Sequence, residues 1–237
     1  MVYIIAGATG VLGSAIAEDL SKNNNIFLIG RDKEKIESMS NKYNCNYALV
    51  DLNNPIPQRE FKNVIDSEIE IKGLINCIGS VLIKPLHGTS IDEFYKIINT
   101  NLFSSYYLLS TFAKRMKNGS AIFFSSVAAS LGLSNHELIS AAKSGIEGFV
   151  RSSAASYSKD NLRINAIAPS IMKSNMSKKI LSSEQAIEIS KSMHPIPKIG
   201  TYNDILPVVR LLLSDESEWI TGQTISIDGG LSKIKPR

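Results

Sequence analysis

MVYIIAGATGVLG, residues 1–13, is the stretch that decides the fold of this chain. The residues before Gly7 are apolar, aromatic or β-branched and predict a strand, and Ser14 opens a helical pattern. Glycines at positions 7, 10 and 13 allow a tight turn, a close approach of the backbone to a pyrophosphate, and close packing of helix on strand. The N–H groups of the helix N-terminus would face the anion. The stretch therefore predicts a dinucleotide-phosphate site, although glycines at such turns also serve purely steric needs.

The composition is that of one ordinary α/β domain. The chain has 237 residues, of which 43% are hydrophobic, enough for one large core, and we predict a single domain over 1–237. The net charge of +4 comes from scattered Lys and Arg, including a basic tail at 233–237, and indicates no nucleic-acid partner. The first apolar run is short and lacks a basic flank, so we expect no signal peptide, no membrane partner and a cytosolic protein. Cys45 and Cys77 fit no metal or redox spacing, so we expect reduced, buried thiols and no metal.

Strand and helix patterns alternate along the whole chain. Strands are predicted over 1–6, 26–30, 47–51, 73–79, 120–126, 162–168 and 223–228, and helices from 14 and over 31–43, 91–117, 137–159 and 203–213. This alternation predicts an α/β, Rossmann-like fold: one doubly wound parallel sheet of seven strands with helices on both faces. The Ser134-x-x-Glu137 spacing predicts a capping box at the start of the 137–159 helix. Residues 170–200, here called the flap, have weak periodicity and are predicted to cover a binding cleft as a mobile segment.

Several short motifs follow the glycine turn at regular places. They are Asp51-Leu52, Asn76-Cys-Ile-Gly79, Asn101-Leu102, Ser125-Ser126, Lys143, Arg163-Ile-Asn165-Ala-Ile-Ala-Pro169 and Ile220-Thr-Gly-Gln-Thr-Ile-Ser-Ile-Asp-Gly-Gly230. In order and spacing they resemble the short-chain dehydrogenase/reductase family, from residue 2 to about 230. The resemblance implies an oxidoreductase that reduces a carbonyl, with a 3-oxoacyl or, less favoured, an enoyl compound as substrate. It also implies a homodimer or homotetramer formed through the two long helices, 91–117 and 137–159.

The resemblance also implies a cofactor site. It places Asp51 and Leu52 near the adenine, Asn76 and Gly79 along the ribose and pyrophosphate, and the segment from Pro169 to Ser174 over the nicotinamide. Arg31 stands just after Gly30, where NAD-dependent members tend to place an acidic residue at the end of the strand, so we favour NADP(H) over NAD(H). Arg31 could instead be a solvated residue at a helix start. The full predicted set is Gly7, Thr9, Gly10, Val11, Leu12, Gly13, Arg31, Asp51, Leu52, Asn76, Gly79, Lys143, Pro169 and Ser174.

The chain departs from the family pattern at two positions. Val11 stands where the main branch of the family has its middle glycine, and Gly10 precedes it. Ile139 stands four residues before Lys143, where the family has a proton-transferring Tyr. An alkyl side chain transfers no proton, and loss of such a group typically lowers the rate by about 10²–10⁴-fold. The sequence is therefore consistent with two hypotheses: a reductase with a nonstandard proton source, or a catalytically silent NADP(H)-binding protein with a regulatory or structural role.

The resemblance implies catalytic roles for Asn101, Ser126 and Lys143 in polarising a carbonyl, holding the nicotinamide ribose and organising water. His136 lies seven residues before Lys143, the spacing at which enoyl reductases of the family carry their Tyr, and two helical turns bring these positions onto one face. Imidazole is a competent acid or base near neutrality, so His136 completes the predicted catalytic set. It could equally be an ordinary residue of the first helical turn.

Two loop histidines, His87 and His194, could border the cleft, but the sequence gives neither a role. Apolar flap residues could line a pocket for an apolar small-molecule substrate, or could pack the flap onto the body of the protein. These residues are Ile171, Met172, Met176, Ile180, Leu181 and Met193.

Overall fold

β1 lies inside the sheet of the computed structural model and pairs with β2 on one side and β4 on the other. All seven strands run parallel, in the order β3 (Asn46–Leu49), β2 (Ile26–Gly30), β1 (Val2–Ala6), β4 (Ile71–Asn76), β5 (Ser120–Phe124), β6 (Arg163–Pro169) and β7 (Thr224–Ile227). This confirms the predicted doubly wound seven-stranded sheet. The structure describes residues 1–52 and 58–235, so the last two residues of the basic tail lie outside it.

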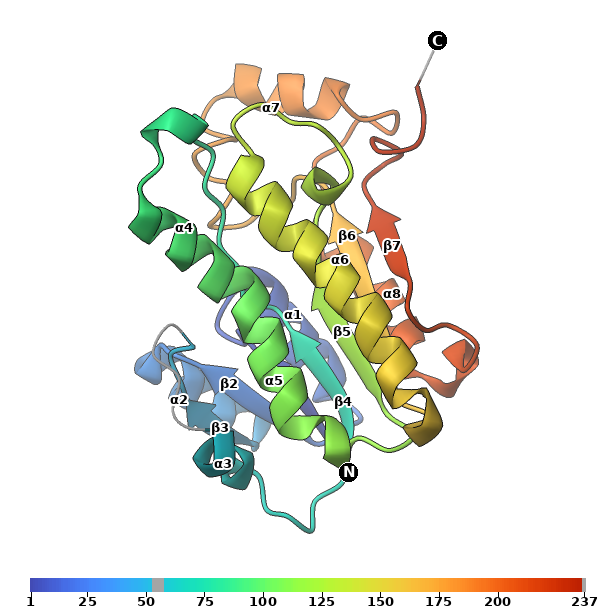
Figure 1. Ribbon diagram of the computed structural model, residues 1–237. Coiled ribbons are helices and arrows are strands. Elements are labelled where there is room, and N and C mark those ends of the chain that lie inside the picture. Colours follow the sequence, from blue (N-terminus) through green and yellow to red (C-terminus); the bar gives the residue numbers. More distant parts are fainter. Residues whose placement is uncertain (53–57, 236–237) are drawn as a thin grey trace.

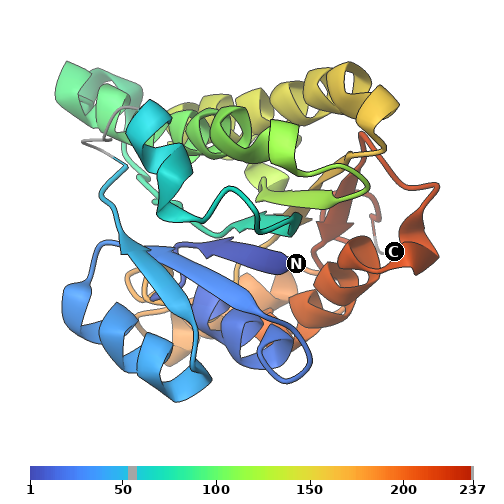
Figure 2. The same ribbon diagram turned by 90° about the horizontal axis from the view of Figure 1, so that it is seen from below.

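Helices cover both faces of the sheet (Figures 1 and 2). One layer holds α5 (Ser104–Phe112) and α6 (Glu137–Tyr157), and the other holds α1 (Val11–Leu20), α2 (Lys33–Tyr43) and α8 (Tyr202–Leu213). Successive residues of a strand point to opposite faces. Accordingly, Ile4 belongs to the core under α5 and α6, whereas Ile5 belongs to the core under α1 and α8. Every residue of β2 and β5 is buried, as expected for parallel strands covered on both sides.

The long helix predicted over 91–117 is interrupted near its middle. It begins as α4 (Ile91–Ile98), where Ser90 and Glu93 form a capping box, passes through a π-helical turn over Asn99–Phe103, and continues as α5. A π-turn inserts one extra residue and changes the direction of the side chains that follow. Asn101 lies within this turn.

The capping box predicted at Ser134 and Glu137 is wrong. α6 begins at Glu137, so its N-cap is His136, and no side chain caps it. Asn135 has a left-handed backbone (φ 63°), which leaves Ser134 two residues before the N-cap instead of at it. Ser134 contributes its carbonyl oxygen instead, 2.7 Å from Nδ1 of His136.

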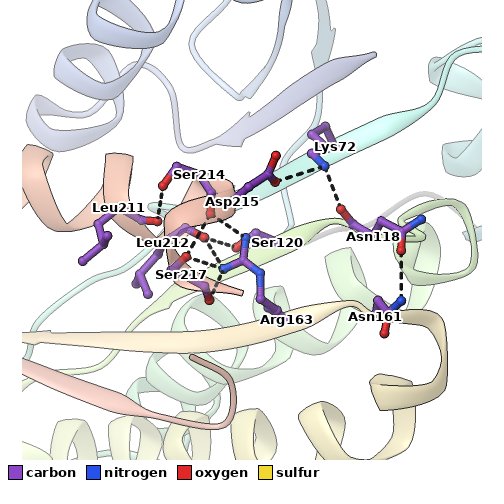
Figure 3. Close-up of polar contacts among 10 residues, drawn as sticks. All are labelled: Lys72, Asn118, Ser120, Asn161, Arg163, Leu211, Leu212, Ser214, Asp215 and Ser217. Atoms are coloured by element: carbon purple, nitrogen blue, oxygen red, sulfur yellow. Dashed lines mark hydrogen bonds and ion pairs between the residues drawn. The ribbon is translucent and has the colours of Figure 1, made fainter. Parts of the chain in front are cut away.

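The C-terminal end of α8 is held by Arg163, the first residue of β6 (Figure 3). Its guanidinium donates to the carbonyl oxygens of Leu212 (2.8 Å), Ser214 (3.1 Å) and Ser217 (3.2 Å). Ser120 Oγ, at the start of β5, also donates to the Leu212 carbonyl, at 2.6 Å. Carbonyls at a helix end lack intrahelical partners, so these bonds satisfy them and attach α8 to the sheet.

The flap is not irregular throughout. It contains α7 (Glu184–Ser192), which the sequence interpretation missed, and Met172 pairs with Gly200 in a parallel bridge that closes the base of the flap. Figure 1 shows α7 above the arrowheads of β6 and β7. The remaining short helix, α3 (Gln58–Phe61), follows β3. None of the helices that the structure describes is both long and apolar enough to span a membrane.

Candidate active site

A cavity of about 510 Å³ opens at the carboxyl ends of β1, β4, β5 and β6, the edge where ligands bind in open parallel sheets. It brings together residues far apart in the sequence. Its walls include the predicted residues Gly10, Val11, Leu12, Gly13, Gly79, Asn101, Ser126, His136, Lys143, Pro169 and Ser174, together with Ile139.

The glycine turn has the geometry of a phosphate cradle. Gly7 has φ +73°, and a Cβ there would lie 2.9 Å from the backbone after β4, at Cys77 and Ile78. A Cβ on Gly13 would overlap the Gly7 carbonyl oxygen. Gly10, the N-cap of α1, has room for a side chain, since the nearest atom would be 3.4 Å away. The first and last glycines are therefore required by close backbone packing, and Gly10 keeps the helix N-terminus open beside Val11.

Other predicted cofactor residues lie along the same edge of the sheet. Arg31 is exposed directly after β2, and Asp51 is exposed two residues after β3, whereas Leu52 is buried. Thr9 lies behind the turn, where its side chain faces Gly30: a Cβ on that glycine would be 3.4 Å from Thr9 Cγ2. These positions are compatible with a dinucleotide that extends from the cavity toward the end of β2.

Asn76, at the end of β4, is 2% exposed and fully engaged within the protein. Its Nδ2 donates to the hydroxyls of Ser104 (3.1 Å) and Ser105 (3.0 Å) on α5, and its Oδ1 accepts from Ile78 N–H (3.0 Å). The amide therefore shapes the chain that leads to Gly79, and its polar atoms are used for that purpose.

Asn101, Gly79 and Lys143 meet at the floor of the cavity. A Cβ on Gly79 would lie 3.2 Å from Asn101 Oδ1 and 3.7 Å from Lys143 Nζ. The Asn101 amide donates to the carbonyl oxygens of Ile97 (3.0 Å) and Ser80 (3.2 Å). The Asn101 side chain, within the π-turn, thus connects α4 to the loop after β4.

Lys143 is 8% exposed, and its ammonium donates to the Phe124 carbonyl at 2.8 Å. Burial lowers the pKa of Lys143 to about 8, because a desolvated charge is disfavoured. A buried ammonium is costly for folding, and such groups concentrate at functional sites.

Ser126, His136 and Ile139 complete the predicted site. Ser126 Oγ accepts from Ala128 N–H at 3.2 Å, which leaves its own hydrogen available. His136 is half-buried, with Nδ1 turned to the Ser134 carbonyl. Ile139 is 4% exposed. The cavity thus contains all four predicted catalytic residues and Ile139, the position at which the resemblance predicted a missing phenol.

The sequence interpretation missed one pair of residues in this cavity. Ser170 Oγ lies 2.6 Å from Nε2 of His194, and His194 Nδ1 lies 2.7 Å from the Ser190 carbonyl oxygen. His194 is only 6% exposed. The two partners are 24 residues apart in the sequence, so no local sequence pattern predicts their contact. His87, by contrast, is exposed and does not line the cavity.

One side of the cavity is apolar. Five of the six predicted flap residues line it, and Leu181 does not. We call these five the apolar wall: Ile171, Met172, Met176, Ile180 and Met193.

The two cysteines are free thiols and only half-buried, so the expectation of full burial is corrected. Cys77 lines the cavity, and burial raises its pKa. Among residues 1–52 and 58–235, no group of three or more His, Cys, Asp and Glu side chains is arranged to hold a metal ion.

The chain is similar to reductases over nearly its whole length. Residues 7–232 match the family described as enoyl-(acyl carrier protein) reductase. The sequence is 31% identical to 3-oxoacyl-[acyl-carrier-protein] reductase FabG of Buchnera aphidicola, over 97% of this chain and 96% of that protein. It is 28% identical to a chloroplastic tropinone reductase homolog of Arabidopsis thaliana, over 98% of this chain and 76% of that protein.

Solved structures show the same similarity. 4-Hydroxyisoleucine dehydrogenase complexed with NADH has a TM-score of 0.90 at 26% identity and covers 99% of both chains. A variant of ElxO with NADPH bound has a TM-score of 0.87 at 25% identity, over 97% of this chain and 98% of that one.

The parallel sheet, the glycine cradle and the cavity at the strand ends define the Rossmann-type fold of nicotinamide-dependent oxidoreductases. The matches over the full length make the assignment specific. The chain belongs to the short-chain dehydrogenase/reductase family.

Proposed function

We propose that the protein is an NADP(H)-dependent reductase of carbonyl compounds, with 3-oxoacyl substrates favoured and enoyl substrates less so. The observation that carries the proposal is the presence of Asn101, Ser126 and Lys143 in one cavity with the glycine turn. Identity of 31% to a 3-oxoacyl-[acyl-carrier-protein] reductase supports the substrate class. The apolar wall suits a substrate with an apolar chain.

The preference for NADP(H) over NAD(H) rests on Arg31. An acidic residue at the end of the second strand would bind the 2′-hydroxyl of NAD(H), whereas a guanidinium pairs with the 2′-phosphate of NADP(H). Related folds hold NADH in one protein and NADPH in another, so this side chain is the main support for the choice. In the proposal, residues 7–13 hold the pyrophosphate, Asp51 and Leu52 border the adenine, Gly79 and Lys143 hold the nicotinamide ribose, and the segment from Pro169 to Ser174 covers the nicotinamide.

The bound nicotinamide would supply the hydride, and the residues of the cavity would supply the remaining chemistry. Ser126 would donate its free hydroxyl hydrogen to the substrate carbonyl oxygen. The Lys143 ammonium would favour the negative charge that develops on this oxygen. An imidazole would provide the proton, and His136 is the candidate that the sequence supplies. Its Nδ1 faces a carbonyl and therefore carries hydrogen, so Nε2 is the nitrogen available for exchange.

The second candidate function is NADP(H) binding without turnover, in a regulatory or structural role. Ile139 is the observation that favours it, because this buried alkyl group replaces the family's proton-transferring phenol at the cavity wall. We favour the enzyme, since the Ser126 hydroxyl, which accepts from Ala128 N–H, keeps its own hydrogen to donate to a substrate oxygen in the cavity.

The proposal includes a homodimer or homotetramer. Large apolar side chains are exposed on the α4–α5 unit, at Ile91, Phe94, Tyr95 and Tyr106, and association would bury them. We also propose that the flap closes over the cavity when ligands bind, with α7 moving as part of it.

The deciding experiment follows NADPH oxidation with simple ketones, 3-oxoacyl thioesters and enoyl thioesters, beside calorimetric binding of NADPH and NADH. Turnover with one carbonyl class supports the reductase. NADPH binding without turnover of any substrate supports the silent binding protein, and no binding of either dinucleotide contradicts both.

A further inference from the structure

The Ser170–His194 pair is built as a proton-transfer unit. A carbonyl oxygen only accepts hydrogen bonds, so His194 Nδ1, which faces the Ser190 carbonyl, must carry a hydrogen. In the neutral ring Nε2 then holds a lone pair, and the Ser170 hydroxyl donates to it at 2.6 Å. An imidazole fixed at one nitrogen and bonded through the other to a serine hydroxyl is the arrangement in which histidine exchanges protons with serine.

The pair is close to the predicted chemistry. Phe124 of β5 pairs with Ile167 of β6, so Ser126 and Ser170 follow the ends of two neighbouring strands. Ser170, His194, Ser126 and Lys143 all line the 510 Å³ cavity. The oxygen of Ser170 still has two lone pairs available for a ligand.

His194 also lines a second cavity, which offers its imidazole a route for proton exchange with water. Ser170 and His194 line an adjoining cavity of about 240 Å³ together with Asp228. Burial alone would raise the pKa of Asp228, but hydrogen bonds from Ser232 and Gly230 and the nearby imidazole lower it.

This inference rests on the reductase function proposed above. We propose that Ser170 exchanges a proton with the substrate oxygen and that His194 exchanges it with Ser170, so that the pair replaces the phenol missing at position 139. In reduction, a bound reduced nicotinamide would supply the hydride for the new C–H bond, and the carbonyl π electrons would move to oxygen. That oxygen takes the Ser170 hydroxyl proton while Ser170 takes the Nε2 proton of the His194 imidazolium. The neutral ring regains a proton from water in the smaller cavity, and alcohol oxidation runs through the same steps in reverse.

The relay makes the two directions respond oppositely to pH. Reduction needs the imidazolium and slows as pH rises, whereas oxidation needs the neutral ring and slows as pH falls. The charged groups that line the two cavities beside the pair are Lys143 and Lys173 in the larger one and Lys198, Asp204 and Asp228 in the smaller one.

The test compares Ser170→Ala, Ser170→Thr and His194→Gln, with His87→Gln as a control on an exposed histidine outside the cavity. We expect Ser170→Ala and His194→Gln to lower kcat by about 10²-fold or more, and the dissociation constant of NADPH to stay within about twofold. Ser170→Thr keeps the hydroxyl and should retain most of the rate. The opposite pH profiles should flatten in His194→Gln.

A readout without turnover accompanies the kinetics. In ¹⁵N spectra of the ligand-free protein, His194 should show hydrogen on Nδ1 and an Nε2 resonance that shifts in Ser170→Ala. Unchanged kcat in His194→Gln, or loss of rate in His136→Phe alone, overturns the relay while the reductase function stands. Equal loss of NADPH affinity and rate also overturns it, since that indicates a structural role. If the wild-type protein binds NADPH and reduces nothing, the reductase function fails and the relay fails with it.

Discussion

At the scale of single residues, Ile139 separates this cavity from a complete short-chain reductase site. It lies one helical turn before Lys143 and lines the same cavity as Ser126. In the function proposed above, the groups that would orient a phenol are present in the cavity, and Ile139 stands in place of the phenol.

We predict that Ile139→Tyr creates or raises NADPH-dependent reduction of simple activated ketones. The new phenol would lie near the Lys143 ammonium, which lowers a phenol's pKa by favouring the charged form. The gain could reach about 10²-fold, the lower end for an acid–base group. Ile139→Phe adds the ring without the hydroxyl and is the control. An Ile139→Tyr protein that folds, binds NADPH and reduces no carbonyl would show that more than one residue is missing, and would favour the silent binding protein.

Arg31 decides the second prediction at this scale. If its guanidinium pairs with the 2′-phosphate, Arg31→Ala should weaken NADPH binding by about 10–100-fold and leave NADH binding nearly unchanged. Lys33→Ala, which removes an exposed cation two residues away, should affect both cofactors little. Calorimetric titration of both variants measures the difference, and equal weakening of NADPH and NADH by Arg31→Ala would exclude the assignment.

Lys143 predicts a pH-dependent stability. Its pKa is about 8 in the folded protein and near the ordinary lysine value of 10.5 in the unfolded chain, so the unfolded state binds more protons between these values. The cost of burial is complete below pH 8 and disappears as pH rises through this window. Lys143→Met should therefore stabilise the ligand-free protein by roughly 1–3 kcal/mol at pH 7, and the gain should shrink toward pH 10.5. Denaturant unfolding at several pH values measures the difference, and a gain independent of pH would contradict it.

The resemblance to the family predicted that Asn101, Ser126 and Lys143 belong to one site, and helical spacing from Lys143 added His136. The sequence did not reveal the contact between Ser170 and His194, because that contact depends on how the flap folds back after α7. It also did not show that the polar atoms of Asn76 are engaged with α5.

At the scale of elements, apolar runs and capping residues predicted most boundaries of strands and helices. The predictions were wrong where contacts between distant residues determine the local conformation. No local sequence pattern predicts the π-turn at 99–103. Within this turn, the Asn101 amide donates hydrogen bonds to the carbonyl oxygens of Ser80 and Ile97. α7 was missed because its apolar residues are sparse, although Ser183 is a regular N-cap whose hydroxyl accepts from Ala186 N–H.

The end of α8 provides a stability prediction (Figure 3). Arg163→Met removes the donors that satisfy the carbonyls of Leu212, Ser214 and Ser217 and should destabilise the protein by about 2–4 kcal/mol. Arg210→Ala, also on α8, breaks an exposed ion pair with Asp19 of α1 and should cost less than about 1 kcal/mol. Urea unfolding of both variants tests this, and a similar loss in the two would mean that the Arg163 bonds add little.

At the scale of the whole molecule, the fold could be predicted because strands and helices alternate over nearly the full length. A parallel sheet with short connections is the arrangement that buries the apolar faces of both the strands and the helices. The order of strands places β1 inside the sheet, between β2 and β4. The sequence did not reveal the shape of the cavity, which depends on side chains from several separate segments of the chain.

The parallel arrangement has a consequence for how the protein reaches its working state. The cavity takes its walls from residues between Gly10 and Leu231, so it exists only after the contacts most distant along the chain have formed. Contacts of high sequence separation form slowly, because loop-closure entropy must be overcome first. During refolding, dinucleotide binding should therefore appear with the slowest folding phase and after most helical signal has returned. A nascent chain should bind no cofactor before its last strand has left the ribosome.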